Sequence, residues 1–315
     1  KDLSTLFVSL ASLAGLDAQL VLVDTRDRGQ KQMILPSMEF NHCIVKATID
    51  GKEQYIELTD GNLPFGSVPN SLYEALSLEI PRQPEKASGT QLKQIKTRNR
   101  TADKVARNMI VHIEGTDLKI DAKVTKTGAL TSGVREQYED LSTEKQREEL
   151  EKSVSGGYKN TVKVEKASFT GLDELIDSVS YAYNFSVKNE VVEVGDMGMI
   201  KVPFTDVVAT LDNFSIEKRE FPIEYYNYEN TDEYETVIKI RAPKGKQFFE
   251  VPKDESMAFK NSKYSIRFIK SKPDEVTIIR KANLNRDNIA AADYLAFQDF
   301  FNKIVKVESK YIGFK

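Results

Sequence analysis

The stretch from Phe40 to Asp60, FNHCIVKATIDGKEQYIELTD, decides the fold of the first part of this chain. Two runs rich in apolar and β-branched residues flank Asp50-Gly51, a dipeptide that favours the positive φ angles of a two-residue hairpin turn. The sequence therefore predicts two antiparallel strands in which Ile49 pairs with Lys52.

One of the two histidines of the chain, His42, stands at the entrance of this hairpin. Counting back from the turn places His42 opposite Thr59. Because side chains alternate between the faces of a strand, Glu57 is expected on the face of His42 and within reach of it. A histidine with a carboxylate on its own face is half of a catalytic constellation, and the other half would be a nucleophile.

The residues before the hairpin predict a helix and one buried strand. Residues 1–15 carry apolar side chains at three-and-four spacing, and Gly15 follows as a stop signal. The run from Leu20 to Val23 is short and apolar, which favours a buried strand. Residues 1–80 thus form a predicted α+β domain, and the turn-rich segment 81–97 is the predicted linker.

The region from 98 to 315 is predicted to be mainly β and sandwich-like, with two helices and a further division near residue 210. Strands are expected at 105–126 (two strands), 178–188, 199–203, 234–241, 263–270 and 275–281, and helices at 143–154 and 287–306. In the strand at 178–188, alternation of apolar and small polar residues predicts one packed face and one wetter face.

The composition excludes several classes of protein. The 45 Lys and Arg residues are balanced by 48 Asp and Glu, so the broad basic face of a nucleic-acid binder is not expected. No apolar run reaches the roughly 20 residues that span a bilayer. A single cysteine, Cys43, rules out an intrachain disulfide and a cysteine-cluster zinc site. No cofactor or metal is expected, and Cys43 itself should point away from His42 as a buried thiol.

Three segments in order carry a resemblance to a known family. KDLSTLFVSLASLAGLDAQLVLV, FNHCIVKATIDG and YIELTDGNLPFG resemble the second half of a bacterial transglutaminase-like domain of the papain-related superfamily. The remainder of the chain, including FPIEYY, resembles the uncharacterised β-rich region that follows this domain in such proteins. The resemblance implies a partial papain-like core followed by a β-rich region.

The resemblance also implies a set of catalytic residues. The family cysteine lies in a Gly-Asp-Cys-Lys-Asp run, of which Lys1 and Asp2 match the end, so the nucleophile is expected immediately before Lys1. The family histidine matches His42. The family aspartate aligns with Glu57, and Asp60 matches a second acid of the same run. Either could orient His42: the two-residue turn favours Glu57, whereas a three-residue turn would favour Asp60.

Two functions are expected from these observations. The first is a fragment of a thiol acyltransferase or amidase acting on peptide or amide bonds, inactive without its cysteine, with a peptide, protein or glycan as substrate. The second is a non-catalytic binding or scaffolding protein with a degenerate fold. The resemblance implies a secreted, periplasmic or cell-envelope location, and an uncovered apolar face in the first domain would favour self-association.

Overall fold

The structure is a computed structural model, and it describes residues 1–28, 39–83, 91–97, 99–208 and 214–315. The backbone forms two compact units. The first comprises Lys1–Asp103 with Thr127–Glu136 and Gly171–Ser178, and the second comprises Lys104–Lys126, Gln137–Thr170 and Val179–Lys315. The first unit therefore runs beyond the predicted linker and takes two segments from later in the sequence. The division expected near residue 210 lies outside the described residues.

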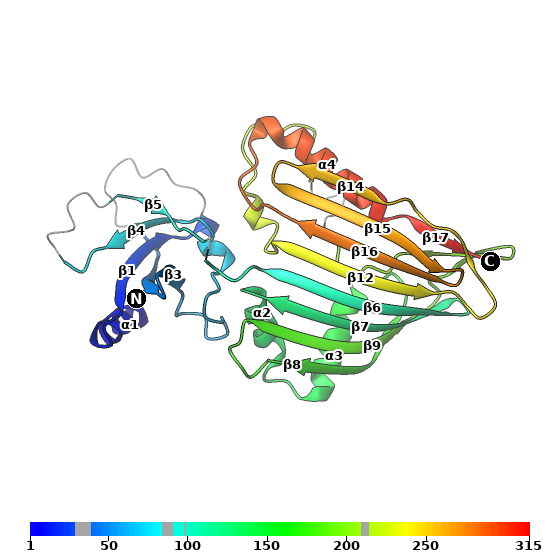
Figure 1. Cartoon of the computed structure of the whole chain (residues 1–315), viewed down its shortest axis with the longest axis horizontal. Helices are drawn as coiled ribbons and strands as arrows, with labels where there is room; N and C mark the ends of the chain where they lie inside the picture. The colour runs from blue at the N-terminus through cyan, green and yellow to red at the C-terminus, as the bar shows by residue number, and fades with distance from the viewer. Residues whose placement is uncertain (29–38, 84–90, 98, 209–213) are drawn as a thin grey trace. The chain divides into compact units, whose positions relative to one another are not determined.

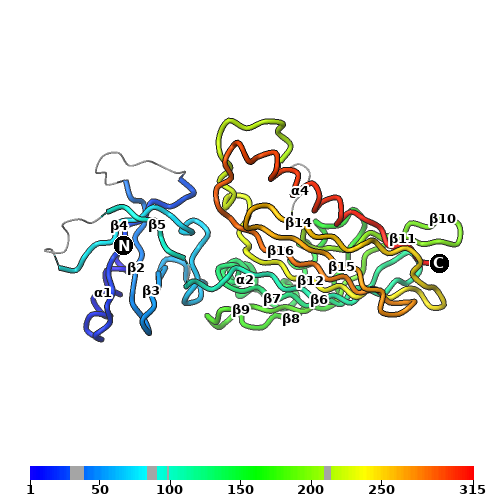
Figure 2. The backbone as a smooth tube through the Cα atoms, turned by 45° about the horizontal axis from the view of Figure 1, so that its top comes forward, coloured from blue at the N-terminus to red at the C-terminus, as the bar shows by residue number. Residues whose placement is uncertain are grey.

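The first unit is built on a five-stranded sheet in the order β3-β2-β1-β4-β5, with α1 against β1 and β2 (Figure 2). Its elements are α1 (Asp2–Leu13), β1 (Asp17–Asp24), the short 3-10 helices Arg26–Arg28 and Asn70–Leu72, β2 (His42–Ile49), β3 (Lys52–Ile56), β4 (Leu76–Ile80) and β5 (Lys93–Gln94). The helix α2 (Leu130–Tyr138) joins this unit through its first seven residues.

The predicted hairpin is present with the predicted register. Ile49 pairs with Lys52, and Asp50 and Gly51 have φ angles of 51° and 72°. These values are those of the tight turn that the Asp-Gly dipeptide favours. The local sequence is therefore sufficient to set which residues of β2 and β3 lie opposite each other.

Both faces of the first sheet carry a core. One face holds Val21, Val23, Ile44, Tyr55, Val68, Leu72, Ala75 and Ile95. The other holds Ala18, Val45, Ala47 and Ile56 beneath Ala11 of α1, with Phe7 and Val8 partly buried. The leucines that give α1 its periodicity are nevertheless exposed, and Leu13 is 86% exposed. The helix packs on the sheet through Phe7, Val8 and Ala11, and its leucines lie on the opposite, exposed face.

The second unit contains sheets of eight and four strands, ordered β14-β15-β16-β12-β6-β7-β9-β8 and β10-β11-β17-β13 (Figure 1). Its strands are β6 (Lys104–Glu114), β7 (Asp117–Thr127), β8 (Val162–Thr170), β9 (Ser178–Val187), β10 (Val192–Val194), β11 (Met197–Lys201), β12 (Glu233–Arg241), β13 (Phe248–Glu250), β14 (Glu255–Phe259), β15 (Ser262–Lys272), β16 (Glu275–Asn283) and β17 (Tyr311–Phe314). Among its described residues, the helical segments include α3 (Thr143–Ser155), α4 (Tyr294–Glu308) and the 3-10 turns Tyr225–Asn227 and Ala291–Asp293.

The described chain is a β-rich α+β protein, and the helices after residue 98 differ from expectation. The prediction of two helices in this region is wrong, because α2 is a third helix. Its sequence, LTSGVREQY, is only nine residues long and contains Gly133, and its side chains Val134, Arg135 and Tyr138 are buried by contacts with other parts of the fold. The predicted helix at 287–306 begins only at Tyr294, because Ile289 instead forms an antiparallel bridge with Ile223.

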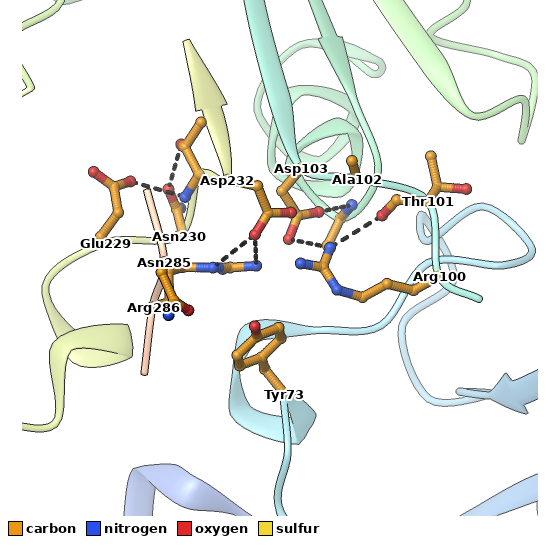
Figure 3. A network of polar contacts seen from close by, with 12 residues as sticks. Tyr73, Arg100, Thr101, Ala102, Asp103, Glu229, Asn230, Asp232, Asn285 and Arg286 are labelled. Atoms are coloured by element: carbon orange, nitrogen blue, oxygen red, sulfur yellow. Dashed lines mark hydrogen bonds and ion pairs between the residues drawn. The ribbon is translucent and has the colours of Figure 1, made fainter. Parts of the chain in front are cut away.

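Buried ion pairs stabilise the second unit. Arg280 of β16 is fully buried and pairs with Asp206 at 2.9 Å and with Glu308 of α4 at 3.1 Å. Arg286, 1% exposed, pairs with Asp232 at 2.9 Å (Figure 3). Each charge is compensated, as a buried guanidinium requires, so these arginines have a structural explanation.

Candidate active site

The structure brings together His42 and Glu57. The Nε2 atom of His42 lies 2.5 Å from Oε2 of Glu57. The Glu57 side chain is 4% exposed, whereas that of His42 is 22% exposed. The imidazole is therefore held from one side by a buried carboxylate and remains accessible to solvent, as a group that must exchange protons requires.

The backbone around His42 is fixed by its neighbours. His42 is the first residue of β2 and pairs with Val23 of β1. Asn41 donates its backbone N–H to the carbonyl of Val23 at 3.2 Å, and its side chain accepts the N–H of Thr25 at 2.9 Å. These hydrogen bonds fix the backbone next to His42 at the end of the sheet.

Glu57 lies just beyond the end of β3. Its Oε1 atom accepts two hydrogen bonds from Thr59, one from the backbone N–H at 2.6 Å and one from the hydroxyl at 2.5 Å. Burial disfavours the charged carboxyl, but the hydrogen bonds from His42 and Thr59 outweigh burial and lower the pKa of Glu57 from 4.5 to about 2. The carboxylate is thus ionised at neutral pH and able to orient the imidazole.

Asp60 makes different contacts. Its Oδ1 atom accepts the backbone N–H of Asn62 at 2.9 Å, and its Oδ2 atom accepts the hydroxyl of Ser132 at 2.6 Å. Of the two acids that the sequence left open as partners of His42, the structure pairs His42 with Glu57. The catalytic role of all three residues stays a prediction.

The first turn of α1 lies beside the end of β2. Ser4, 1% exposed, donates its hydroxyl to the carbonyl of Cys43 at 2.8 Å. By strand alternation, α1 covers the face that carries Cys43 and Val45, while His42 points to the other face.

The remaining sequence candidates lie elsewhere. Cys43 is a buried free thiol, 6% exposed, on the α1 side of the sheet. His112 lies in β6 of the second unit, between Lys119 of β7 and Arg241 of β12. Ser132 and Arg135 of α2, which sequence reasoning missed, contact the loop that follows Glu57. No local signal marks their contacts with this loop, because Asp60 and Asn62 lie more than 70 residues away from them in the sequence.

The fold and the site define a β-rich α+β protein with a histidine–carboxylate pair at the end of a strand. A family model described as a domain of unknown function, DUF3858, matches residues 197–314 in the second unit. No curated protein matches the chain. Among the helices of the described residues, none is long and apolar enough to cross a membrane.

A solved structure is similar to the chain over nearly all of its length. It is described as a "putative protease" from Parabacteroides distasonis, and it shares 11% sequence identity at a TM-score of 0.49. The similarity covers 99% of this chain and 42% of that protein. The chain therefore spans less than half the length of the protein it matches.

Proposed function

We propose that this chain carries the base and the orienting acid of a transglutaminase-like thiol acyltransferase or amidase. The substrate class is a peptide or amide carbonyl. His42 is the general base and acid, Glu57 orients it, and a cysteine preceding Lys1 supplies the thiol. The single observation that carries the proposal is the 2.5 Å contact between His42 Nε2 and the buried, ionised Glu57.

In the proposed mechanism, the two nitrogens of His42 have different roles. Because the Glu57 carboxylate accepts a hydrogen bond from Nε2–H, the basic lone pair lies on Nδ1. Nδ1 would take the thiol proton as sulfur attacks the carbonyl carbon, and the resulting imidazolium would return that proton to the leaving amine. The product of this half-reaction is a thioester. Water then completes a hydrolysis, or a second amine completes a transfer.

The partial exposure of His42 supports this role. A buried structural histidine would be enclosed by its partners, whereas His42 is held on one side and open on the other. The position of α1 beside the same end of β2 also supports it, because a helix N-terminus stabilises a thiolate.

The test uses the full-length protein, extended upstream of Lys1, and a fluorogenic peptide amide as substrate. Turnover should be abolished by iodoacetamide, and His42→Ala should lower kcat/KM by about 10² to 10⁴. Glu57→Gln should lower it less, because the substitution removes the orienting charge and keeps the base. The matched control is His112→Ala, which removes the other histidine and should leave kcat/KM unchanged.

A fully active His42→Ala enzyme would overturn the proposal. Absence of any thiol-dependent turnover, with a residue other than cysteine before Lys1, would instead favour the non-catalytic binding protein. The substitution of glutamate for the family aspartate at Glu57 is the sequence feature that favours this second function.

A further inference from the structure

The sheet does not hold Glu57 in place. The ladder between β2 and β3 runs from Ile49↔Lys52 to Val45↔Ile56, so Glu57 is the first residue past its last pair. A carboxylate that must keep one oxygen on His42 and the other on Thr59 needs a fixed backbone. The restraint must come from residues outside the hairpin.

That restraint is found in α2. The loop after Glu57 contains Asp60, which accepts the Ser132 hydroxyl at 2.6 Å, and Asn62, whose carbonyl accepts from Arg135 Nη1 at 3.0 Å. Ser132 and Arg135 lie three positions apart on one face of α2. Two polar contacts from α2 thus fix the loop at Asp60 and at Asn62, three and five residues beyond Glu57.

Arg135 is fully buried and connects this loop to the segment Gly171–Ser178, which also belongs to the first unit. Its Nε atom donates to the carbonyl of Gly171 at 3.2 Å, and its Nη2 atom donates to the carbonyl of Ile176 at 2.7 Å. The planar guanidinium can hold several acceptors in one fixed arrangement, which a lysine cannot reproduce. All of these partners belong to the first unit.

The residues that lead into α2 are held by other residues of the first unit. Asp103, 1% exposed, accepts the backbone N–H of Ala129 at 2.7 Å. It also pairs with Arg100 at 3.1 Å (Figure 3). The Arg100 guanidinium lies 5.1 Å from the centre of the Tyr73 ring. The hydroxyl of Thr127 donates to the carbonyl of Ala102 at 2.8 Å. The start of α2 is therefore fixed, and the helix can hold the loop that follows Glu57 in place.

We infer that α2 positions the catalytic carboxylate, with Ser132 and Arg135 as positioning residues that act through Asp60 and Asn62 on Glu57. This inference rests on the proposed function for its catalytic meaning. It also gives Asp60 a role distinct from that of Glu57: Asp60 anchors the loop, while Glu57 contacts the imidazole.

The experiment follows the ¹³C resonance of the Glu57 side-chain carboxyl by NMR as the pH is lowered, using the chain itself. In the wild type the resonance should titrate near pH 2, as the hydrogen bonds from His42 and Thr59 require. In Ser132→Ala the midpoint should rise by about 0.5 to 1 pH unit toward 4.5, because a looser turn weakens those bonds. Ser132→Thr keeps the hydroxyl and should restore the wild-type midpoint. Glu136→Gln, an exposed change on the same helix, should leave it unmoved.

The outcomes separate this inference from the proposed function. If the Glu57 midpoint is near pH 2 in the wild type and Ser132→Ala leaves it unchanged, the positioning role of Ser132 is overturned. The proposed pairing of His42 with Glu57 is unaffected by that result. A wild-type midpoint near 4.5 that His42→Ala does not move overturns the pair itself. Arg135→Lys provides a second variant: it should shift the Glu57 midpoint in the same direction as Ser132→Ala, and an unshifted midpoint in the folded variant overturns the role of Arg135.

Discussion

Ser4 of α1 donates its hydroxyl to the carbonyl of Cys43, and this buried bond fixes the first turn of the helix beside the residue that follows His42. Its removal should cost about 1 to 2 kcal/mol of unfolding free energy, since it is fully shielded from water. We predict this loss for Ser4→Ala, measured by urea denaturation. Ser9→Ala is the matched control, because Ser9 is exposed on the same helix; equal losses in the two variants would contradict the prediction.

The low pKa of Glu57 predicts how stability depends on pH. The folded-state pKa is about 2 and the ordinary value is 4.5, so the ionised carboxylate stabilises the fold above about pH 4.5. This contribution, at most about 3.4 kcal/mol and less where solvent screens the charge, is lost as the pH falls from 4.5 toward 2. Wild type should therefore be more stable than Glu57→Gln at pH 7, and the gap should narrow over this range in denaturation curves. A gap that is constant with pH would show that the carboxylate charge contributes nothing.

The hairpin turn gives a test of backbone strain. Gly51 has a φ of 72° and open space around its Cα, so Gly51→Ala should cost about 1 kcal/mol through conformation alone. Gly133 lies inside α2, also in open space but with ordinary helical φ, and Gly133→Ala should stabilise by about 0.5 to 1 kcal/mol. Thermal unfolding of both variants should show shifts of opposite sign.

Packing in the four-stranded sheet leaves no room at Gly198. A methyl group added there would overlap the ring of Phe314, which is 2% exposed and belongs to the neighbouring strand β17. We predict that Gly198→Ala destabilises the protein by about 1 to 3 kcal/mol, measured by guanidinium denaturation. The double variant Gly198→Ala with Phe314→Leu should lose less than the sum of the two single changes, and strict additivity would argue against the steric cause.

The exposed leucines of α1 should contribute little to folding and more to association. Leu6 and Leu10 are 55% and 56% exposed, so the double change to Gln should alter the unfolding free energy by no more than about 0.5 kcal/mol. The same change should reduce any concentration-dependent self-association seen by sedimentation equilibrium. A strongly destabilised double variant would show that these leucines are buried within the chain in solution.

Local sequence was enough to predict the elements whose signals are short-range. The Asp50-Gly51 turn fixed the register of β2 and β3, and alternation along β9 correctly predicted the buried positions Val179 and Phe185. Where the signal was weak or misleading, prediction failed. The helix α2 was missed, and the helix expected at 287–306 begins only at Tyr294.

The sequence by itself determined that His42 and Glu57 would share one face at the end of a hairpin, because turn type and the two-residue period of a strand are local properties. Only the tertiary structure decided what holds the second acid, Asp60. Its Oδ2 atom accepts a hydrogen bond from Ser132, a hydroxyl that lies 72 residues away in the sequence and that folding brings back to it. Contacts between residues so far apart leave no periodic trace in the sequence, since they arise from how the elements pack against one another.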